Sequence, residues 1–467
     1  YVILKQTGLE RKLHTPQKHP LNPVLKREKP WEAFRVQVYG TILYDQDADL
    51  FKAWYMNIPD TAANKITVNG QNRPGPATLL SYATSPDGLQ WFKPVLDLVD
   101  FEGSTENNMI ALELYNPEGF SVLYEPHDPN LMHRYKALYW DHGFGPLIMH
   151  EGQEIYGEGE KDGIHAAFSP DGIHWTPYAG NPVLKVGSDS GHCVLFDPAL
   201  GKYVAFSRFG FGRKVARIES ADFIHWSPPE LVIEPDAADG PDTEIYGISV
   251  DLYDGLYIGM LWMFDIQEGN VGTIDMQLCH SRDGRTWTRD PERRVFLGRG
   301  REGAWDGGDL RAACRSVVLD DRILIYYAGS AALHGLGGKQ NIGMDIGLAT
   351  LRKDGWMSLS AEDSQGSFVT KTLIHPGGDL YVNSAASYGS VRVAVLDEKG
   401  ARIPGLEAEI AEDNVRAKAV FPENTFAPLA GQPIHLLFTI SHTEMYSFWF
   451  EQNGDILPEP ELTAIEF

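Results

Sequence analysis

Short runs of apolar, β-branched and aromatic residues alternate with polar turns along most of the 467-residue chain. Five times, two such runs are joined by a short acidic turn, which is the pattern of a β-hairpin. The predicted hairpins cover residues 41–55, 122–139, 194–206, 250–261 and 317–327. A third strand is expected after each hairpin. The pattern therefore predicts five similar units built from strands.

A turn motif, Ser-x-Asp-Gly-x-x-Trp, follows the predicted third strand in most units. Its Asp side chain can accept hydrogen bonds from the backbone ahead of it, and Gly tolerates the left-handed conformation of a tight turn. The Trp is expected to fill space between neighbouring sheets. Clear copies occupy residues 85–91, 169–175 and 281–287, with a degenerate copy at 220–226 and a weak echo at 353–356.

Repeated units of this size are typical of a β-propeller, whose blades have four strands each. We therefore predict an all-β protein with a five-bladed β-propeller at residues 31–360. A polar, acidic stretch precedes further alternating strands, which predict a C-terminal β-sandwich at residues 367–467. Residues 1–30 are basic and rich in proline, and we expect them to run over the propeller as an extended arm.

The formal net charge of −24 argues against nucleic acid or an anionic membrane as a partner. No apolar run approaches the length of a membrane span. The three cysteines lack metal-type spacing and are expected to be reduced, buried thiols. The chain starts with Tyr1, so a removed upstream segment could have carried a signal peptide. A secreted or periplasmic location is favoured over a cytoplasmic one, and the oligomeric state is not predicted.

Function in a propeller is expected where the innermost strands converge on the axis. A second repeat, clearest as Asn-Pro-Val-Leu at residues 22–25 and 181–184, precedes the predicted innermost strands. Each blade then carries a carboxylate at a similar depth, and carboxylates gathered on one axis raise each other's pKa. The candidate wall residues are Trp31, Glu32, Arg35, Glu106, Asn107, Asn108, Asp189, His192, Asp242, Glu244, Tyr246, Glu302, Trp305, Asp306 and Asp309.

Clustered carboxylates beside aromatic residues are the groups that glycoside hydrolysis requires, because one carboxylic acid protonates the leaving oxygen while a second carboxylate attacks or activates water. We predict Asp189, Glu244 and Asp306 as the catalytic set, with Glu244 as general acid and either aspartate as base or nucleophile. Aromatic residues would stack on the sugar, and polar ones would hold its hydroxyls. The predicted substrate-binding residues are Trp31, Glu106, Asn107, Asn108, His192, Arg208, Asp242, Tyr246, Trp305, Asp309 and Arg311.

Each of these carboxylates also has a purely structural interpretation. Asp189 and Asp242 could be turn residues, and Asp306 and Asp309 could bond the amides of a glycine-rich loop. The coincidence of position across blades therefore supports the set more than any single member.

The turn motif, the Asn-Pro-Val-Leu repeat and the trailing sandwich resemble the group formed by glycoside hydrolase families 32, 43 and 68. The chain looks most similar to bacterial family-32-like proteins, with matching phrases at residues 189–191, 244–246 and 305–306. This resemblance implies cleavage of furanosides or pentosides. The chain departs from family 32 at Gln37, which stands where that family places its nucleophilic aspartate, and the third blade lacks a Glu-Cys pair.

The sequence thus predicts an exo-acting glycoside hydrolase whose partner is an oligosaccharide or glycoside. A glycoside phosphorylase is one alternative, with Arg208, Arg213 and Arg311 as a phosphate site. A non-catalytic glycan-binding propeller is the other. No cofactor is required, although a structural calcium ion would find abundant oxygen ligands. Retention or inversion depends on the distance between the two carboxylates, which a sequence does not give.

Overall fold

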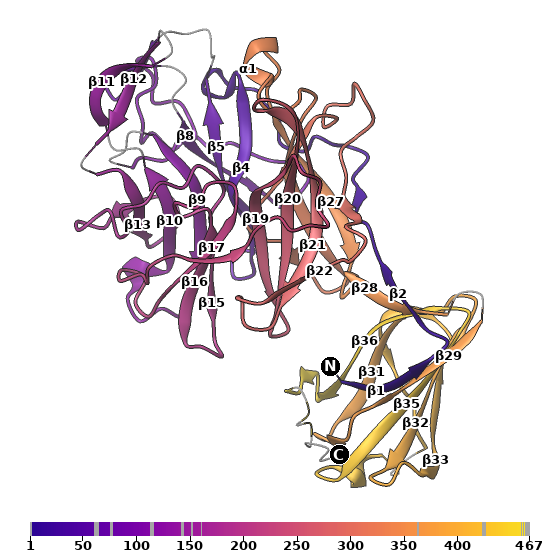
Figure 1. Cartoon of the computed structure of the whole chain (residues 1–467). Coiled ribbons are helices and arrows are strands. Elements are labelled where there is room, and N and C mark those ends of the chain that lie inside the picture. Colours follow the sequence, from indigo (N-terminus) through magenta and orange to yellow (C-terminus); the bar gives the residue numbers. More distant parts are fainter. Residues whose placement is uncertain are drawn as a thin grey trace. The chain divides into compact units, whose positions relative to one another are not determined.

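A computed structural model describes residues 2–458 except 60–64, 75–77, 113–115, 142–143, 151–152, 160, 362–363 and 423–425, together with Pro460 and Leu462. The chain forms two compact units (Figure 1). The larger contains residues 16–317 and 324–350, and the smaller contains residues 1–15, 318–323 and 351–467. The all-β prediction is confirmed, since the described helices are one four-residue α-helix, α1 (Gly337–Gln340), and three short 3-10 turns.

Within its described residues, the larger unit has sheets of seven, four and ten strands. Their antiparallel pairings divide the strands into five successive groups, because single parallel pairs, Gly40 with Phe120 and Ile274 with Asp309, join the groups within the two larger sheets. In each group the strands follow one another as predicted, a hairpin first and then a third strand. The five groups are β4 (Arg35–Asp45), β5 (Leu50–Ile58) and β8 (Leu79–Ser85); β9 (Pro117–Tyr124), β10 (Tyr135–Asp141), β13 (Gly163–Ser169) and β14 (Thr176–Pro177); β15 (Cys193–Asp197), β16 (Lys202–Ser207), β17 (Val215–Ser220) and β18 (Glu230–Ile233); β19 (Thr243–Tyr253), β20 (Leu256–Glu268), β21 (Val271–Ser281), β22 (Trp287–Arg289) and β23 (Val295–Leu297); and β24 (Asp309–Ala312), β25 (Val317–Val318), β26 (Arg322–Ser330), β27 (Asp345–Arg352) and β3 (Gln17–Lys18).

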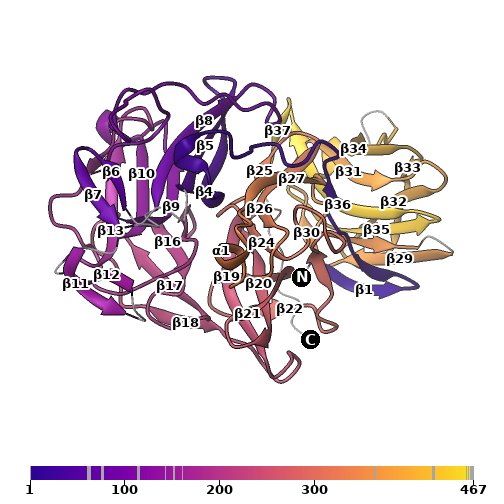
Figure 2. The ribbon, with the colours of Figure 1, turned by 90° about the horizontal axis from the view of Figure 1, so that it is seen from above.

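The first strands of the five groups form a closed ring. Strand β4 contacts β9, β9 contacts β15, β15 contacts β19, β19 contacts β24, and β24 returns to β4. The other strands of each group extend outward from this ring (Figure 2). Two further hairpins, β6 (Lys65–Val68) with β7 (Gln71–Pro74) and β11 (Phe144–His150) with β12 (Gln153–Glu158), are inserted in the first two blades and form separate two-stranded sheets. This arrangement is a β-propeller whose first strands surround a common axis.

The ring closes through a strand from the N-terminal region. Strand β3 pairs antiparallel with β27, so the fifth blade takes its outer strand from residues far away in sequence. Lys18 of β3 donates a hydrogen bond of 2.5 Å to Asp306, which also accepts 3.0 Å from the Tyr327 hydroxyl. Asp306 is buried, so its charge is compensated mainly by this lysine. The bond pins the closing strand to the loop before β24.

The repeated turns form as their sequence predicts. In the three clear copies and in the degenerate copy, the Asp side chain accepts two backbone hydrogen bonds of 2.7–2.9 Å from the residues two and three positions ahead. In the degenerate copy, Phe223 adopts the left-handed backbone that Gly takes elsewhere. Two turns also bind the preceding blade, since Trp54 donates to the Gly172 carbonyl and Tyr326 to that of Gly88. The motif therefore fastens neighbouring blades as well as reversing the chain.

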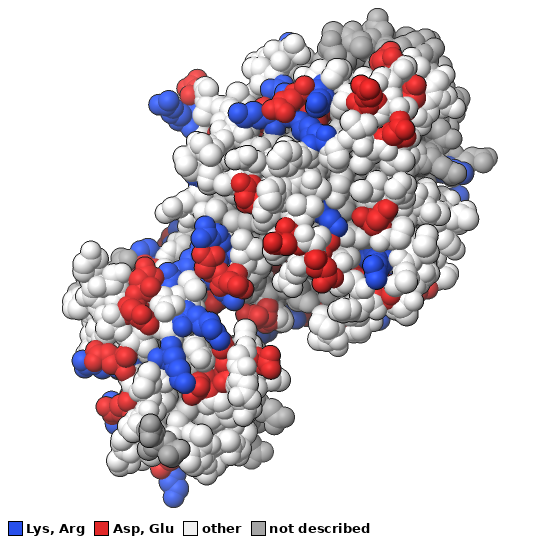
Figure 3. Space-filling model, turned by 180° about the vertical axis from the view of Figure 1, so that it is seen from behind, with Lys and Arg blue, Asp and Glu red and all other residues white. Residues whose placement is uncertain are grey.

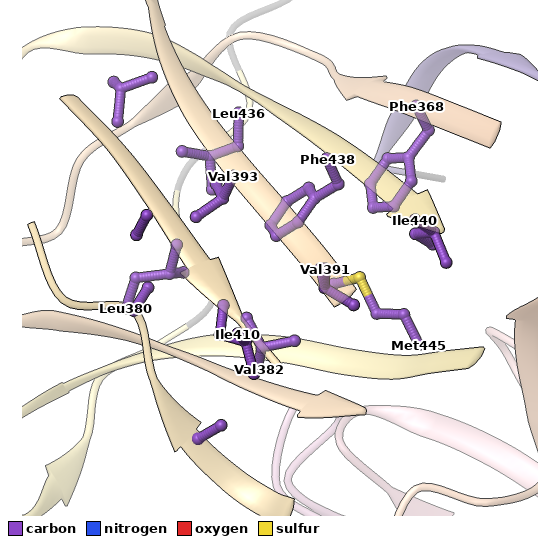
Figure 4. Close-up of a cluster of buried hydrophobic side chains, with 14 of the residues drawn as sticks. Phe368, Leu380, Val382, Val391, Val393, Ile410, Leu436, Phe438, Ile440 and Met445 are labelled. Carbon is purple, nitrogen blue, oxygen red and sulfur yellow. The ribbon is translucent and has the colours of Figure 1, made fainter. Parts of the chain in front are cut away.

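The smaller unit is a sandwich of two antiparallel sheets, which confirms the predicted C-terminal fold. Buried apolar residues from both sheets form its core, including Phe368, Leu380, Val391, Phe438 and Met445 (Figure 4). One sheet contains β1 (Ile3–Thr7), β29 (Gln365–Thr370), β30 (Leu373–Ile374), β32 (Ser390–Asp397), β33 (Arg402–Ile410) and β35 (Pro433–Ser441). The other contains β2 (Glu10–Leu13), β28 (Met357–Ser360), β31 (Asp379–Ala385), β34 (Asp413–Lys418), β36 (Glu444–Gln452) and β37 (Asp455–Ile456).

Two sequence expectations differ from this structure. The segment expected to be an arm over the propeller is divided between the units, because β1 and β2 pair with sandwich strands β29 and β28 while β3 completes a blade. The weak turn echo at 353–356 does not lead to an outer blade strand; it leads directly into β28 of the sandwich. In both cases long-range strand pairing, which local patterns do not encode, decides the outcome.

We predict that Asp306→Asn destabilises the propeller by about 2–3 kcal/mol, because Lys18 would lose its anionic partner on one side of the ring closure. This is somewhat less than for a fully buried pair, since the Lys18 side chain is 28% exposed. The measurement is the melting temperature followed by circular dichroism. Asp290→Asn, which breaks the exposed pair with Arg294, is the matched control and should cost under about 1 kcal/mol. Equal shifts for the two variants would contradict the closing role of Asp306.

Candidate functional site

A cavity of about 230 Å³ lies among residues at the ends of the propeller's first strands. Each of the five blades contributes to it. The polar and aromatic residues of its wall are Arg35 and Tyr39 from β4, Glu118 from β9, Asp189 from the loop before β15, Tyr246 from β19, Asp309 and Arg311 from β24, and His334 from the loop before β27. The propeller topology thus gathers groups that are distant in sequence around one small space.

Asp309 and Arg311 form a buried, bidentate ion pair on this wall. The guanidinium donates 2.6 and 3.1 Å hydrogen bonds to the two carboxylate oxygens. Although burial opposes ionisation, Arg311 and His334 lower the pKa of Asp309 to about 2. His334 lies 3.0 Å from Arg311, and burial lowers its own pKa. Asp309 therefore stays ionised at neutral pH and neutralises the charge of Arg311. An ionised carboxylate is a poor proton donor, so Asp309 is not a candidate general acid.

Tyr246 forms an aromatic wall with cations on its faces. The guanidinium carbons of Arg208 and Arg311 lie 4.5 and 4.9 Å from its ring centre, within the range of cation–π attraction. Arg208 also donates 3.1 and 2.9 Å hydrogen bonds to the Tyr246 carbonyl, so the ring is held by both its backbone and its face. A third bond from Arg208, of 3.4 Å, reaches Asp189, whose side chain is 62% exposed.

The remaining wall carries polar groups from β4. The buried Gln37 accepts hydrogen bonds of 3.3 Å from both Arg35 and Arg311. Tyr39 stacks on Trp262 at 5.5 Å, and burial raises the pKa of Tyr39 well above its usual range. Its hydroxyl has no hydrogen-bond partner among the described residues, although it is buried. A buried donor of this kind is costly unless a ligand or water satisfies it.

The structure brings only part of the predicted site to the cavity. Asp189, Tyr246, Asp309 and Arg311 line it, and Arg208 supports Tyr246 from behind. Asp306 does not line the cavity and holds Lys18. Glu244 does not line it either; its carboxylate pairs with Arg213 at 2.6 Å and is 40% exposed. The predicted carboxylates therefore do not all lie at one depth: Asp189 and Asp309 reach the cavity, and Glu244 and Asp306 do not.

The other predicted binding residues hold loops and strands together. Trp31 donates 2.9 Å to Asn108, which itself donates to Tyr55 and to the Tyr82 carbonyl. The remaining members also lie off the cavity wall. Asn107 bonds the backbone of its own loop, and Glu106 and Asp242 are exposed. Trp305 stacks on Tyr327, and burial lowers the pKa of the buried His192 to about 4.

Sequence reasoning missed Glu118, Tyr39 and His334, whereas Arg35 lies in the stretch expected to form blade one's part of the wall. Glu118 was missed because of the spacing in the second blade. Its copy of the second repeat, Pro-Val-Leu at residues 94–96, lies farther from the first strand of the blade than the corresponding copies lie in the other blades. The candidate wall was therefore placed at residues 106–108, ahead of β9. Glu118 is the second residue of β9, so a search for a carboxylate at the start of each first strand would have found it. His334 comes from a loop after a hairpin, and no repeat marks it.

The described residues contain no group of three or more His, Cys, Asp or Glu side chains arranged to hold a metal ion. The suggested structural calcium therefore has no assigned ligands and stays a prediction. The three cysteines are free and buried, as expected. None of the helices in the described part of the chain is long and apolar enough to cross a membrane. On the face shown in Figure 3, acidic and basic side chains are interspersed.

No protein-family model and no curated protein matches the chain. Among solved structures, it is similar to a glycosyl hydrolase from Bacteroides ovatus, with 14% identity over 73% of this chain and 94% of that one, and a TM-score of 0.48. It is also similar to a glycoside hydrolase of the GH130 family of mannoside phosphorylases that targets β-1,2-mannosidic linkages in Candida mannan, with 13% identity over 73% and 94% and a TM-score of 0.47.

An α-L-arabinofuranosidase from Podospora anserina shares 14% identity over 72% of this chain and 98% of that one, with a TM-score of 0.45. The propeller assignment rests on the strand pairing of this chain. Since no family model matches, the family-32-like resemblance stays a prediction.

We predict that Asp309→Asn destabilises the propeller by about 3–5 kcal/mol, because it leaves the buried Arg311 without a counter-charge. The wild-type carboxyl has a pKa of about 2, below the value near 3.9 of an unfolded chain. Its contribution is therefore complete above about pH 5 and is lost as the pH falls toward 2. Urea unfolding measured from pH 7 to pH 3 should show that the difference in the free energy of unfolding between wild type and variant becomes smaller as the pH falls. A constant gap, or one as small as that of the exposed control Asp189→Asn, would contradict this.

Proposed function

We propose that the protein is a glycoside hydrolase whose active site is the central cavity of the propeller. One observation carries this proposal: two carboxylates, Glu118 and Asp189, line the same cavity as the aromatic face of Tyr246 and the hydrogen-bond donors of β4 and β24. Glycoside hydrolysis needs two carboxyl groups flanking one bond and a surface that orients the sugar. The fold likeness to solved glycosidases is compatible with it but is not its basis.

In this proposal Asp189 is the base or nucleophile. Arg208 donates a 3.4 Å hydrogen bond to its carboxylate and so orients it beside the cavity. The side chain is largely exposed, so water or a sugar carbon can approach it. Asp189 is the one member of the sequence-predicted catalytic set that remains a candidate.

Glu118 is the proposed general acid in place of Glu244. It lies on β9, across the strand ring from the salt-bridged wall of β24, and it is partly buried. A general acid has to lie within hydrogen-bond reach of the leaving oxygen, which the place of Glu118 on the cavity wall allows. Glu244 is instead paired with Arg213 at 2.6 Å and does not line the cavity.

The size of the cavity favours a small occupant. Pockets for drug-sized ligands usually measure about 300–1,000 Å³, and this cavity holds about 230 Å³. Such a space suits one terminal sugar, which agrees with exo action on an oligosaccharide. A furanoside or pentoside substrate follows only from the family resemblance.

The test is release of free sugar from a panel of aryl glycosides and oligosaccharides. Asp189→Asn and Glu118→Gln should each lower the rate by about 10²–10⁴-fold, as expected for loss of a general acid or base. Glu244→Gln is the matched control and should stay within a few fold of wild type. Full loss in Glu244→Gln with activity retained in Glu118→Gln would overturn the assignment of the acid.

A phosphorylase remains the second candidate because guanidinium groups line the cavity beside its carboxylates. It predicts that turnover requires inorganic phosphate and yields a sugar phosphate. The same panel run with and without phosphate separates the two reactions. Saturable binding with no product in either condition would favour the glycan-binding alternative.

A further inference from the structure

Two guanidinium groups of the cavity wall share one neutral acceptor, Gln37, which does not itself line the cavity. Arg35 and Arg311 each donate a 3.3 Å hydrogen bond to the side-chain oxygen of Gln37. Gln37 is fully buried, so water does not screen the two cations from each other there. A carboxylate at this position would neutralise one of them, but the amide of Gln37 carries no charge.

Of the two guanidinium groups on this wall, only that of Arg311 is paired with a carboxylate among the described residues. Asp309 forms a bidentate pair with Arg311 and compensates that one cation. Arg35 makes no ion pair with any described residue; its guanidinium lies 5.2 Å from the Phe34 ring centre and its Nε is buried without a partner. Burial, and next the charge of Arg311, lower the pKa of Arg35. A positive charge in this setting is favoured only when an anion joins it.

We propose that the cavity binds an acidic sugar, whose carboxylate pairs with Arg35. This inference rests on the proposed function, because it names the class of substrate for the same site. The planar guanidinium matches a carboxylate through two parallel hydrogen bonds. The otherwise unpaired Nε supplies one donor for such a pair.

A carboxylate fits this wall better than a phosphate group does. One uncompensated cation matches a single negative charge, whereas a phosphate group carries about −1.5 to −2 at neutral pH. The two carboxylates Glu118 and Asp189 line the same cavity and would repel the additional charge. A uronic acid residue brings one carboxylate together with hydroxyls for the remaining donors.

The test compares binding of charged and neutral forms of the same sugar. Isothermal titration calorimetry at pH 7 would use full-length protein with glucuronate, galacturonate and mannuronate, their methyl esters, and inorganic phosphate. At least one uronate should bind about tenfold or more tightly than its ester, since a charge-assisted hydrogen bond contributes at least that much. Phosphate should bind more weakly than that uronate.

Two variants locate the effect. Arg35→Gln removes the cation, and Gln37→Glu supplies a counter-charge from the protein while keeping nearly the same shape. Each should reduce the preference for acid over ester to within about twofold, with circular dichroism confirming that it is folded. Arg294→Gln, which removes an exposed cation outside the cavity wall, is the control and should keep the full preference.

Preference for no uronate, preference that survives both variants, or tighter binding of phosphate would overturn the inference. Turnover on the glycoside panel separates it from the proposed function. Cleavage of neutral glycosides without uronate preference would overturn the acidic substrate alone. Arg35-dependent uronate binding without any cleavage would support the anion site and overturn the hydrolase.

Discussion

Closure of the strand ring is the constraint on which the rest of the propeller depends. A propeller remains closed only when its last blade is fastened to its first, and here a two-residue strand, β3, supplies the outer edge of the fifth blade. The Lys18–Asp306 bond holds this strand in the fifth blade, and the Tyr326 hydroxyl bond to the Gly88 carbonyl links the fifth blade to the first. Without closure, β4 and β24 would not meet, and Arg35, Gln37 and Arg311 could not share one wall.

The cavity illustrates how a repeat fold builds a site that is not itself repeated. Equivalent positions on five first strands point toward one space, yet their chemistry differs from blade to blade. Blade one supplies a cation and a tyrosine, blade two a glutamate, blade three an aspartate, blade four a tyrosine, and blade five an ion pair. The Asp309–Arg311 pair places two opposite charges on one side of the cavity, and these charges cancel. Catalysis, in our proposal, is left to the two carboxylates outside that pair.

The fold was largely predictable because its signals are local. Each Asp of the turn motif bonds amides two and three residues ahead, and each hairpin alternates within a dozen residues. The N-terminal strands were not predictable, since β1, β2 and β3 depend on partners more than 300 residues away. The site was predicted in part. Asp189, Tyr246, Asp309 and Arg311 follow their markers, whereas the long interval in blade two hid Glu118, and Asp306 was mistaken for a catalytic group because burial beside Lys18 is invisible in sequence.

The most direct test of the central claim is a crystal structure of the Asp189→Asn variant with an oligosaccharide soaked into it. We predict that a terminal sugar occupies the space between Tyr246, Glu118 and Arg35, with its glycosidic oxygen within hydrogen-bond distance of Glu118. A sugar bound on the sandwich or beside Glu244, with the propeller cavity empty, would contradict the assignment of the active site to the axis.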